Sequence, residues 1–156
     1  MELQGSQTAA GCRFAIVVSR LNAEITDGLL AGARRALAEA QVTDENVTVV
    51  RVPGSFEIPL AAGRLARSGS FDAVICIGCL IKGDTMHFEF IASATSHGIM
   101  DASAATGVPI TFGVLTTLTE EQAYARAGEG ADNKGREAAL AAVEMATLFR
   151  ELRKSG

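Results

Sequence analysis

Four short apolar segments rich in β-branched residues alternate with longer segments of helical periodicity along this chain of 156 residues. The strand-like segments cover residues 13–19, 47–52, 71–77 and 110–115, and the helical ones cover residues 25–40, 56–67, 88–105, 119–127 and 134–153. Strands that are apolar along their whole length are typical of parallel sheets covered on both faces. The alternation therefore predicts an α/β fold, a flavodoxin-like three-layer αβα sandwich around a mainly parallel four-stranded sheet.

The organisation of the chain is simple. A chain of this length can bury a real core within one domain. No repeat, low-complexity segment or linker interrupts it, so we expect a single domain over residues 12–156. Residues 1–11 are polar and contain glycine, and we expect an N-terminal arm that could pair with a neighbouring subunit.

Composition and charge exclude several classes of partner. The formal net charge is -4 and basic residues form no cluster, which argues against nucleic-acid binding. The N-terminus lacks the basic and apolar regions of a signal peptide, and the longest apolar run, residues 73–81, is too short to span a bilayer. We therefore expect a cytoplasmic protein without a membrane partner. Only 21% of residues are charged and 48% are hydrophobic, which indicates apolar surfaces buried in a homo-oligomer.

Two of the three cysteines, Cys76 and Cys79, have the C-x-x-C spacing of a redox pair or of half a zinc site. Both lie in the apolar run of residues 73–81, which we interpret as one strand, where positions i and i+3 point to opposite faces of a sheet. No second Cys or His cluster in the sequence completes four zinc ligands. We interpret both cysteines as small buried side chains and expect no metal site.

A turn after the third strand contains the residues best suited to chemistry. Gly83, Asp84 and Thr85 precede a helix, and His87 follows within the same turn. Amides at a helix start can bind an anion, and ligands bind at the carboxyl ends of parallel strands. An imidazole beside such a turn suggests acid–base chemistry on a phosphorylated small molecule. An ordinary βα loop with a solvated histidine is the alternative.

The other strands end in loops that should lie at the same rim of the sheet. Asn22 could bind a heterocycle that carries amide N–H and C=O groups, or it could cap the next helix. Glu57 could accept hydrogen bonds from a polyol or only complement a helix dipole. Phe112 could contact an aromatic ligand or pack in the core. Lys82 and Arg126 are the basic side chains best suited to binding phosphate.

Five stretches of the chain resemble lumazine synthases in sequence, order and spacing, from about residue 12 to residue 152. They are residues 16–22 (IVVSRLN), 52–59 (VPGSFEIP), 81–88 (IKGDTMHF), 109–116 (PITFGVLT) and 133–139 (NKGREAA). The resemblance implies condensation of 5-amino-6-(D-ribitylamino)uracil with 3,4-dihydroxy-2-butanone 4-phosphate. The product would be 6,7-dimethyl-8-ribityllumazine, formed with release of phosphate and water and without a cofactor, in the penultimate step of riboflavin biosynthesis.

The resemblance also implies site residues and partners. It implies that His87 transfers protons during the reaction. It also implies that Gly83, Asp84, Thr85 and a neighbouring subunit's Arg126 bind the butanone phosphate. The residues that it assigns to ribitylaminouracil are Leu21, Asn22, Ser55, Phe56, Glu57, Cys79, Leu80, Ile81, Phe112 and Lys134. It implies a pentamer, or an assembly of pentamers, with active sites between adjacent subunits, and riboflavin synthase as a candidate partner.

One residue departs from the family pattern. Leu21 stands where relatives usually carry a Phe or Trp that stacks on the pyrimidine ring. A lost aromatic stack is worth about 0.5–1.5 kcal/mol, so we expect weaker uracil binding with the chemistry intact. Two alternatives remain open: a flavin- or lumazine-binding or cage-forming homologue with little turnover, and a generic flavodoxin-like phosphate-binding domain.

Overall fold

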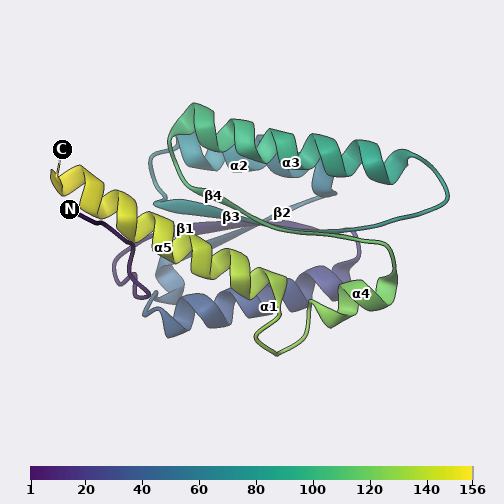
Figure 1. The fold of residues 1–156 in the computed structure, drawn as a ribbon, viewed down its shortest axis with the longest axis horizontal. Coiled ribbons are helices and arrows are strands. Elements are labelled where there is room, and N and C mark those ends of the chain that lie inside the picture. The colour runs from purple at the N-terminus through teal and green to yellow at the C-terminus, as the bar shows by residue number, and fades with distance from the viewer. Residues whose placement is uncertain (156) are drawn as a thin grey trace.

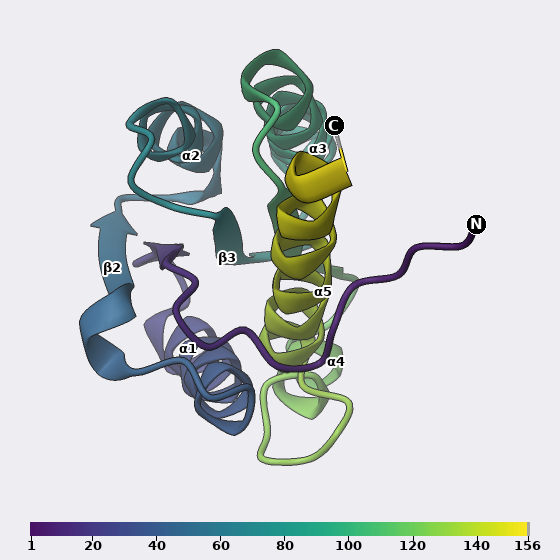
Figure 2. The same cartoon turned by 90° about the vertical axis from the view of Figure 1, so that its left-hand side faces the viewer.

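The computed structural model describes residues 1–155 and has three layers (Figure 1). The middle layer is a parallel sheet of order β2-β1-β3-β4, with strands β1 (Phe14–Ser19), β2 (Val47–Val52), β3 (Ala73–Ile81) and β4 (Ile110–Thr117). Its two faces are covered by helices α1 (Ala23–Glu39), α2 (Ile58–Arg67), α3 (His87–Thr106), α4 (Glu120–Ala125) and α5 (Lys134–Ser155). Helices α2 and α3 lie on one face, and α1, α4 and α5 lie on the other (Figure 2). The predicted α/β sandwich is confirmed.

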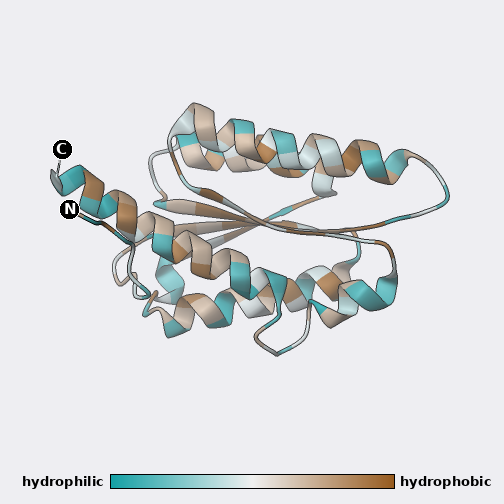
Figure 3. Cartoon of the chain, viewed as in Figure 1, coloured by the Kyte–Doolittle hydropathy of each residue, from teal (hydrophilic) through white to brown (hydrophobic). Residues whose placement is uncertain are grey.

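The two central strands, β1 and β3, are buried along nearly their whole length. Their alternate side chains enter two separate cores, so that Phe14 and Ile16 face α1 and α5 whereas Ala15 and Val17 face α2 and α3. Figure 3 shows the strongly apolar residues concentrated in these strands. Because helices cover both faces, neither strand has a polar side, which explains the continuous apolar runs in the sequence.

Cys76 and Cys79 lie on opposite faces of β3, as the sequence predicted. Cys76 belongs to the core under α2 and α3, and Cys79 belongs to the core under α1 and α5. Both are free thiols, and burial raises the pKa of Cys79 to about 11 and raises the pKa of Cys76 as well. They therefore do not form a redox pair with each other.

Several element boundaries differ from those expected. Strand β3 continues past Gly78 to Ile81, because residues 78–81 pair with residues 114–117 of β4. The glycine marks a close approach within the strand, since a Cβ here would lie 2.7 Å from Ser55 Oγ. The helix expected from residue 56 begins at Ile58, after a 3₁₀ turn over Ser55–Glu57. The predicted capping box of α4 is confirmed, because Thr119 Oγ1 accepts a hydrogen bond from the Gln122 amide at 3.2 Å.

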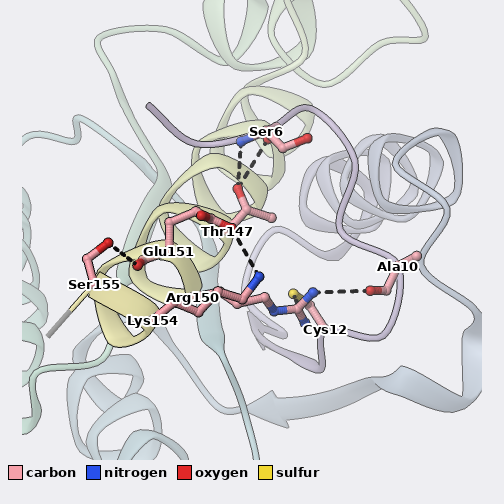
Figure 4. A network of polar contacts seen from close by, with 8 residues as sticks. All are labelled: Ser6, Ala10, Cys12, Thr147, Arg150, Glu151, Lys154 and Ser155. Atoms are coloured by element: carbon pink, nitrogen blue, oxygen red, sulfur yellow. Dashed lines mark hydrogen bonds and ion pairs between the residues drawn. The ribbon is translucent and has the colours of Figure 1, made fainter. Parts of the chain in front are cut away.

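The N-terminal arm lies along α5 of its own chain and contains no helix or strand (Figures 2 and 4). The Ser6 amide donates to Thr147 Oγ1 at 2.7 Å, and the Arg150 guanidinium contacts Cys12 Sγ at 2.8 Å. The Ala9 amide donates to the carbonyl of Ala40 at the end of α1. Pairing of the arm with a neighbouring subunit stays a prediction.

Helices α1 and α5 approach so closely that glycine is required between them. A Cβ on Gly135 would overlap the carbonyl oxygen of Leu29, and a Cβ on Gly32 would overlap the side chain of Asn133. The first clash involves the backbone of α1, which cannot rotate away. The contact therefore fixes the start of α5 against the middle of α1.

We predict that Gly135→Ala lowers the free energy of unfolding by about 2–3 kcal/mol, because the methyl group forces the two helices apart. Urea unfolding followed by circular dichroism measures the change. Gly63→Ala is the matched control in α2, since its Cβ would meet the far end of the Arg67 side chain at 3.1 Å and Ala102 Cβ at an ordinary 3.7 Å, and alanine favours a helix over glycine. Equal stability of the two variants would contradict the close packing of α1 on α5.

Candidate active site

A cavity of about 550 Å³ opens at the carboxyl ends of β1 and β3, beside α3. Most of the predicted site residues line it: Leu21, Asn22, Ser55, Phe56, Glu57, Cys79, Leu80, Ile81, Gly83, Thr85 and His87. The wall is completed by Pro53, Gly54, Phe88 and Ile91, which the sequence analysis did not assign to the site. Ile91 lies four residues after His87 and three after Phe88, and this helical spacing was the signal that could have indicated both apolar residues.

Asn22 joins the ends of the two central strands. Its backbone is left-handed (φ 57°, ψ 51°), a conformation that Asn tolerates better than most residues. Its Nδ2 donates to the carbonyl of Cys79 at 3.0 Å, and the side chain makes no capping hydrogen bond to α1. The interpretation of Asn22 as a side-chain cap is therefore wrong, and this side chain belongs to the cavity wall.

The segment between β2 and α2 forms a second wall. It turns through the 3₁₀ turn Ser55–Glu57, and the first amides of such a turn have no partner inside the turn. Ser55 lines the cavity, and its Oγ is buried and has no hydrogen-bond partner within residues 1–155. Phe56 and Leu21 are 59% and 57% exposed, and their apolar side chains border the cavity.

The third wall is the turn between β3 and α3. His87 is the first residue of α3, and its amide faces Thr85 Oγ1 at 3.4 Å. Gly83 and Thr85 line the cavity, whereas the exposed Asp84 between them is not part of the lining. Lys82 Nζ lies 3.8 Å from Glu89 Oε1, so its charge is partly matched within the turn and the helix.

The remaining predicted residues lie in a separate hollow. Phe112, Arg126 and Lys134 line a volume of about 490 Å³ between the end of β4, α4 and the start of α5. Both hollows open at the carboxyl rim of the parallel sheet, but no residue lines both. Within one chain, the structure therefore brings His87 together with Leu21 and Ser55 and does not bring it together with Arg126.

Asn133 holds this second hollow in shape. It is fully buried, its Nδ2 donates to the carbonyls of Gly28 and Gly128 at 3.1 and 2.7 Å, and its Oδ1 accepts from the Arg136 amide. The Lys134 amide donates to the carbonyl of Arg126 at 2.9 Å. The connector from α4 to α5 is thereby fixed on both sides.

The chemistry of the site follows from these groups. It combines an imidazole, helix-start amides and a polar amide side chain with apolar walls, which suits proton transfer on a polar organic molecule that carries an anion. Residues 1–155 contain no cluster of three or more His, Cys, Asp or Glu that could hold a metal ion. In the same part of the chain, no helix combines the length and the apolar character that crossing a membrane requires.

Comparison with known proteins agrees with this geometry. A family model described as 6,7-dimethyl-8-ribityllumazine synthase matches residues 11–150. Enzymes of that name from Salinibacter ruber and Aquifex aeolicus are 51% and 53% identical to this chain, over 96% of it and over 96% and 97% of their own lengths. The enzyme of that name from Desulfatibacillum aliphaticivorans is 46% identical over 97% of both chains. This chain therefore belongs to the 6,7-dimethyl-8-ribityllumazine synthase family.

Proposed function

We propose that this protein condenses 5-amino-6-(D-ribitylamino)uracil with 3,4-dihydroxy-2-butanone 4-phosphate to form 6,7-dimethyl-8-ribityllumazine. The observation that carries the proposal is the position of His87, at the start of α3 and in one cavity with the amides of two helix starts. Membership of the family supports the same reaction.

The uracil substrate would lie between Leu21, Asn22 and the end of β3. The side chain of Asn22 and the backbone of Cys79, Leu80 and Ile81 offer donors and acceptors to the pyrimidine edge. The amides of Ser55 and Phe56 and the carboxylate of Glu57 would bind the ribityl hydroxyls. Phe112 and Lys134 of a neighbouring subunit would complete this part of the site.

The phosphate of the second substrate would lie at the start of α3. Gly83, Asp84 and Thr85 offer amides and a hydroxyl there, and the helix dipole favours an anion at this end. Lys82 supplies only part of the positive charge that the phosphate needs, because it is already paired with Glu89. The guanidinium of Arg126 from a neighbouring subunit would supply the rest.

His87 would move the protons of each step. The aromatic amine attacks the ketone and water leaves to give an imine, phosphate is then eliminated from the four-carbon unit, and the ribitylamine closes the ring with loss of water. Each step takes a proton from carbon or nitrogen or delivers one to oxygen, and one imidazole can do both in turn. Holding the two substrates together supplies much of the remaining acceleration.

The division of the site into two hollows supports a homo-oligomer. Arg126, Lys134 and Phe112 can join His87 only if the second hollow of one subunit meets the cavity of the next. Large apolar side chains on the outside of α3 are available for such contacts, since Phe90 and Met100 are each 69% exposed. We propose pentamers or assemblies of pentamers, and riboflavin synthase as a partner, on the resemblance to the family alone.

We predict that the wild-type protein, mixed with both substrates, produces the absorbance of the lumazine product, and that His87→Ala lowers kcat about 10²–10⁴-fold without abolishing turnover. His97→Ala is the matched control, because this exposed histidine lies on the same helix and bonds within it through Ser93. An unchanged kcat in His87→Ala would remove this residue from the mechanism. Product binding without turnover by the wild type would instead favour a homologue that has lost catalysis.

We predict that Leu21→Phe lowers KM for the uracil substrate by up to about tenfold, because an aromatic ring can stack on the pyrimidine where a leucine cannot. Steady-state kinetics at saturating butanone phosphate measures the change. Leu152→Phe, at another exposed leucine far along α5, serves as the control. An unchanged or higher KM would show that Leu21 does not face the ring.

We predict that an equal mixture of His87→Ala and Arg126→Ala subunits, unfolded and reassembled together, regains activity well above that of either variant alone. In a ring with sites between neighbours, about a quarter of the sites would combine an intact His87 with an intact Arg126. Each variant reassembled alone is the control. Activity no greater than the sum of the two controls would place both residues in sites made by a single chain.

A further inference from the structure

Helix α3 carries a buried polar side chain that none of the roles described so far uses. Only Thr95 and Ile99 are buried among the 20 residues of this helix, and Thr95 is 1% exposed. Its Oγ1 donates to the carbonyl oxygen of Ser55 at 3.2 Å. Valine has nearly the same shape and suits an apolar core better, so a threonine here indicates a use for the hydroxyl group.

The hydrogen bond joins two walls of the cavity. Ser55 opens the 3₁₀ turn Ser55–Glu57, whose residues line the cavity, and α3 begins with His87, which also lines it. The Ser55 carbonyl also accepts the Ile58 amide, which is local to its own turn. Within residues 1–155, the bond from Thr95 is the one hydrogen bond that a side chain makes to residues 53–57.

A second close contact lies one turn further along α3. A Cβ on Gly98 would lie 2.8 Å from Cβ and Cγ of Pro59, so α3 packs directly on the start of α2. Gly98 and Thr95 are three residues apart and therefore on the same face of the helix. The helix thus touches the segment from Ser55 to Pro59 with a hydrogen bond at one end and a steric contact at the other.

We propose that Thr95 is a positioning residue, which sets the separation between the segment that binds the uracil substrate and the helix that carries His87. This inference rests on the proposed function. Thr95 is itself buried and touches neither substrate; it acts through the backbone of Ser55. The phosphate turn at residues 83–85 does not depend on this bond, because it precedes α3 and connects directly to β3.

The test is a comparison of Thr95→Val with Thr95→Ser, which restores the hydroxyl, and with Thr106→Val. Thr106 is the matched control, because it lies at the far end of α3 and its hydroxyl bonds only there, donating to the carbonyls of Ala102 and Ser103 and accepting from the Val108 amide. We expect Thr95→Val to lower kcat/KM for the uracil substrate about three- to tenfold, with KM for the butanone phosphate within about twofold of wild type. Thr95→Ser and Thr106→Val should behave like the wild type.

Other outcomes overturn the inference. If Thr95→Val folds and has the kcat and KM values of the wild type, the inference is wrong. It is also wrong if kcat falls together with the folded fraction while KM for both substrates stays unchanged, because that result indicates a structural role only. Should Thr95→Val not fold, Thr95→Ala replaces it and is judged by the same constants. If the wild type forms no product, the proposed function fails, and calorimetry of 6,7-dimethyl-8-ribityllumazine binding decides the inference instead. Threefold weaker binding by Thr95→Val would then support it and equal binding would refute it.

Discussion

Pairing of β1 with β3 in the middle of a parallel sheet is the constraint on which the rest of this structure depends. Both strands are buried on both faces, so helices must cover the sheet above and below, and each crossover returns the chain to the same edge. The loops after the strands therefore collect at one rim. Asn22 then connects the two central strands there, through its hydrogen bond to the Cys79 carbonyl.

Close backbone approaches convert this arrangement into a defined cavity. Gly78 lets Ser55 lie against β3, Gly98 lets α3 lie against Pro59, and Gly135 lets α5 lie against α1. The first two bring the walls of the cavity together, and the third fixes the helix that carries Lys134. Small residues at these points explain how a chain with few aromatic residues shapes a site for a large polar substrate.

Single residues predicted the functional site poorly, whereas their combination along the chain predicted it well. A histidine, a glycine turn and an asparagine each have ordinary structural uses, but their order along alternating strands and helices placed them at one rim, where the structure has them. Asn22 shows the limit, because its type fitted a helix cap and only the left-handed backbone shows that its side chain turns to Cys79 instead. Thr95 was not found, because a threonine within an apolar helix carries no local signal of its distant partner, Ser55.

The sequence by itself determined the fold class, the opposite faces of Cys76 and Cys79, and the residues of the rim, because hydrophobic period and turn chemistry are local properties. The tertiary structure decided what depends on contacts distant in sequence: where β3 ends, how closely the helices approach, and which rim residues share a hollow. It placed Arg126 and Lys134 apart from His87, since α4 and the start of α5 lie beyond β4, on the other face of the sheet from α3. That separation follows from the order of strands, which no single segment encodes.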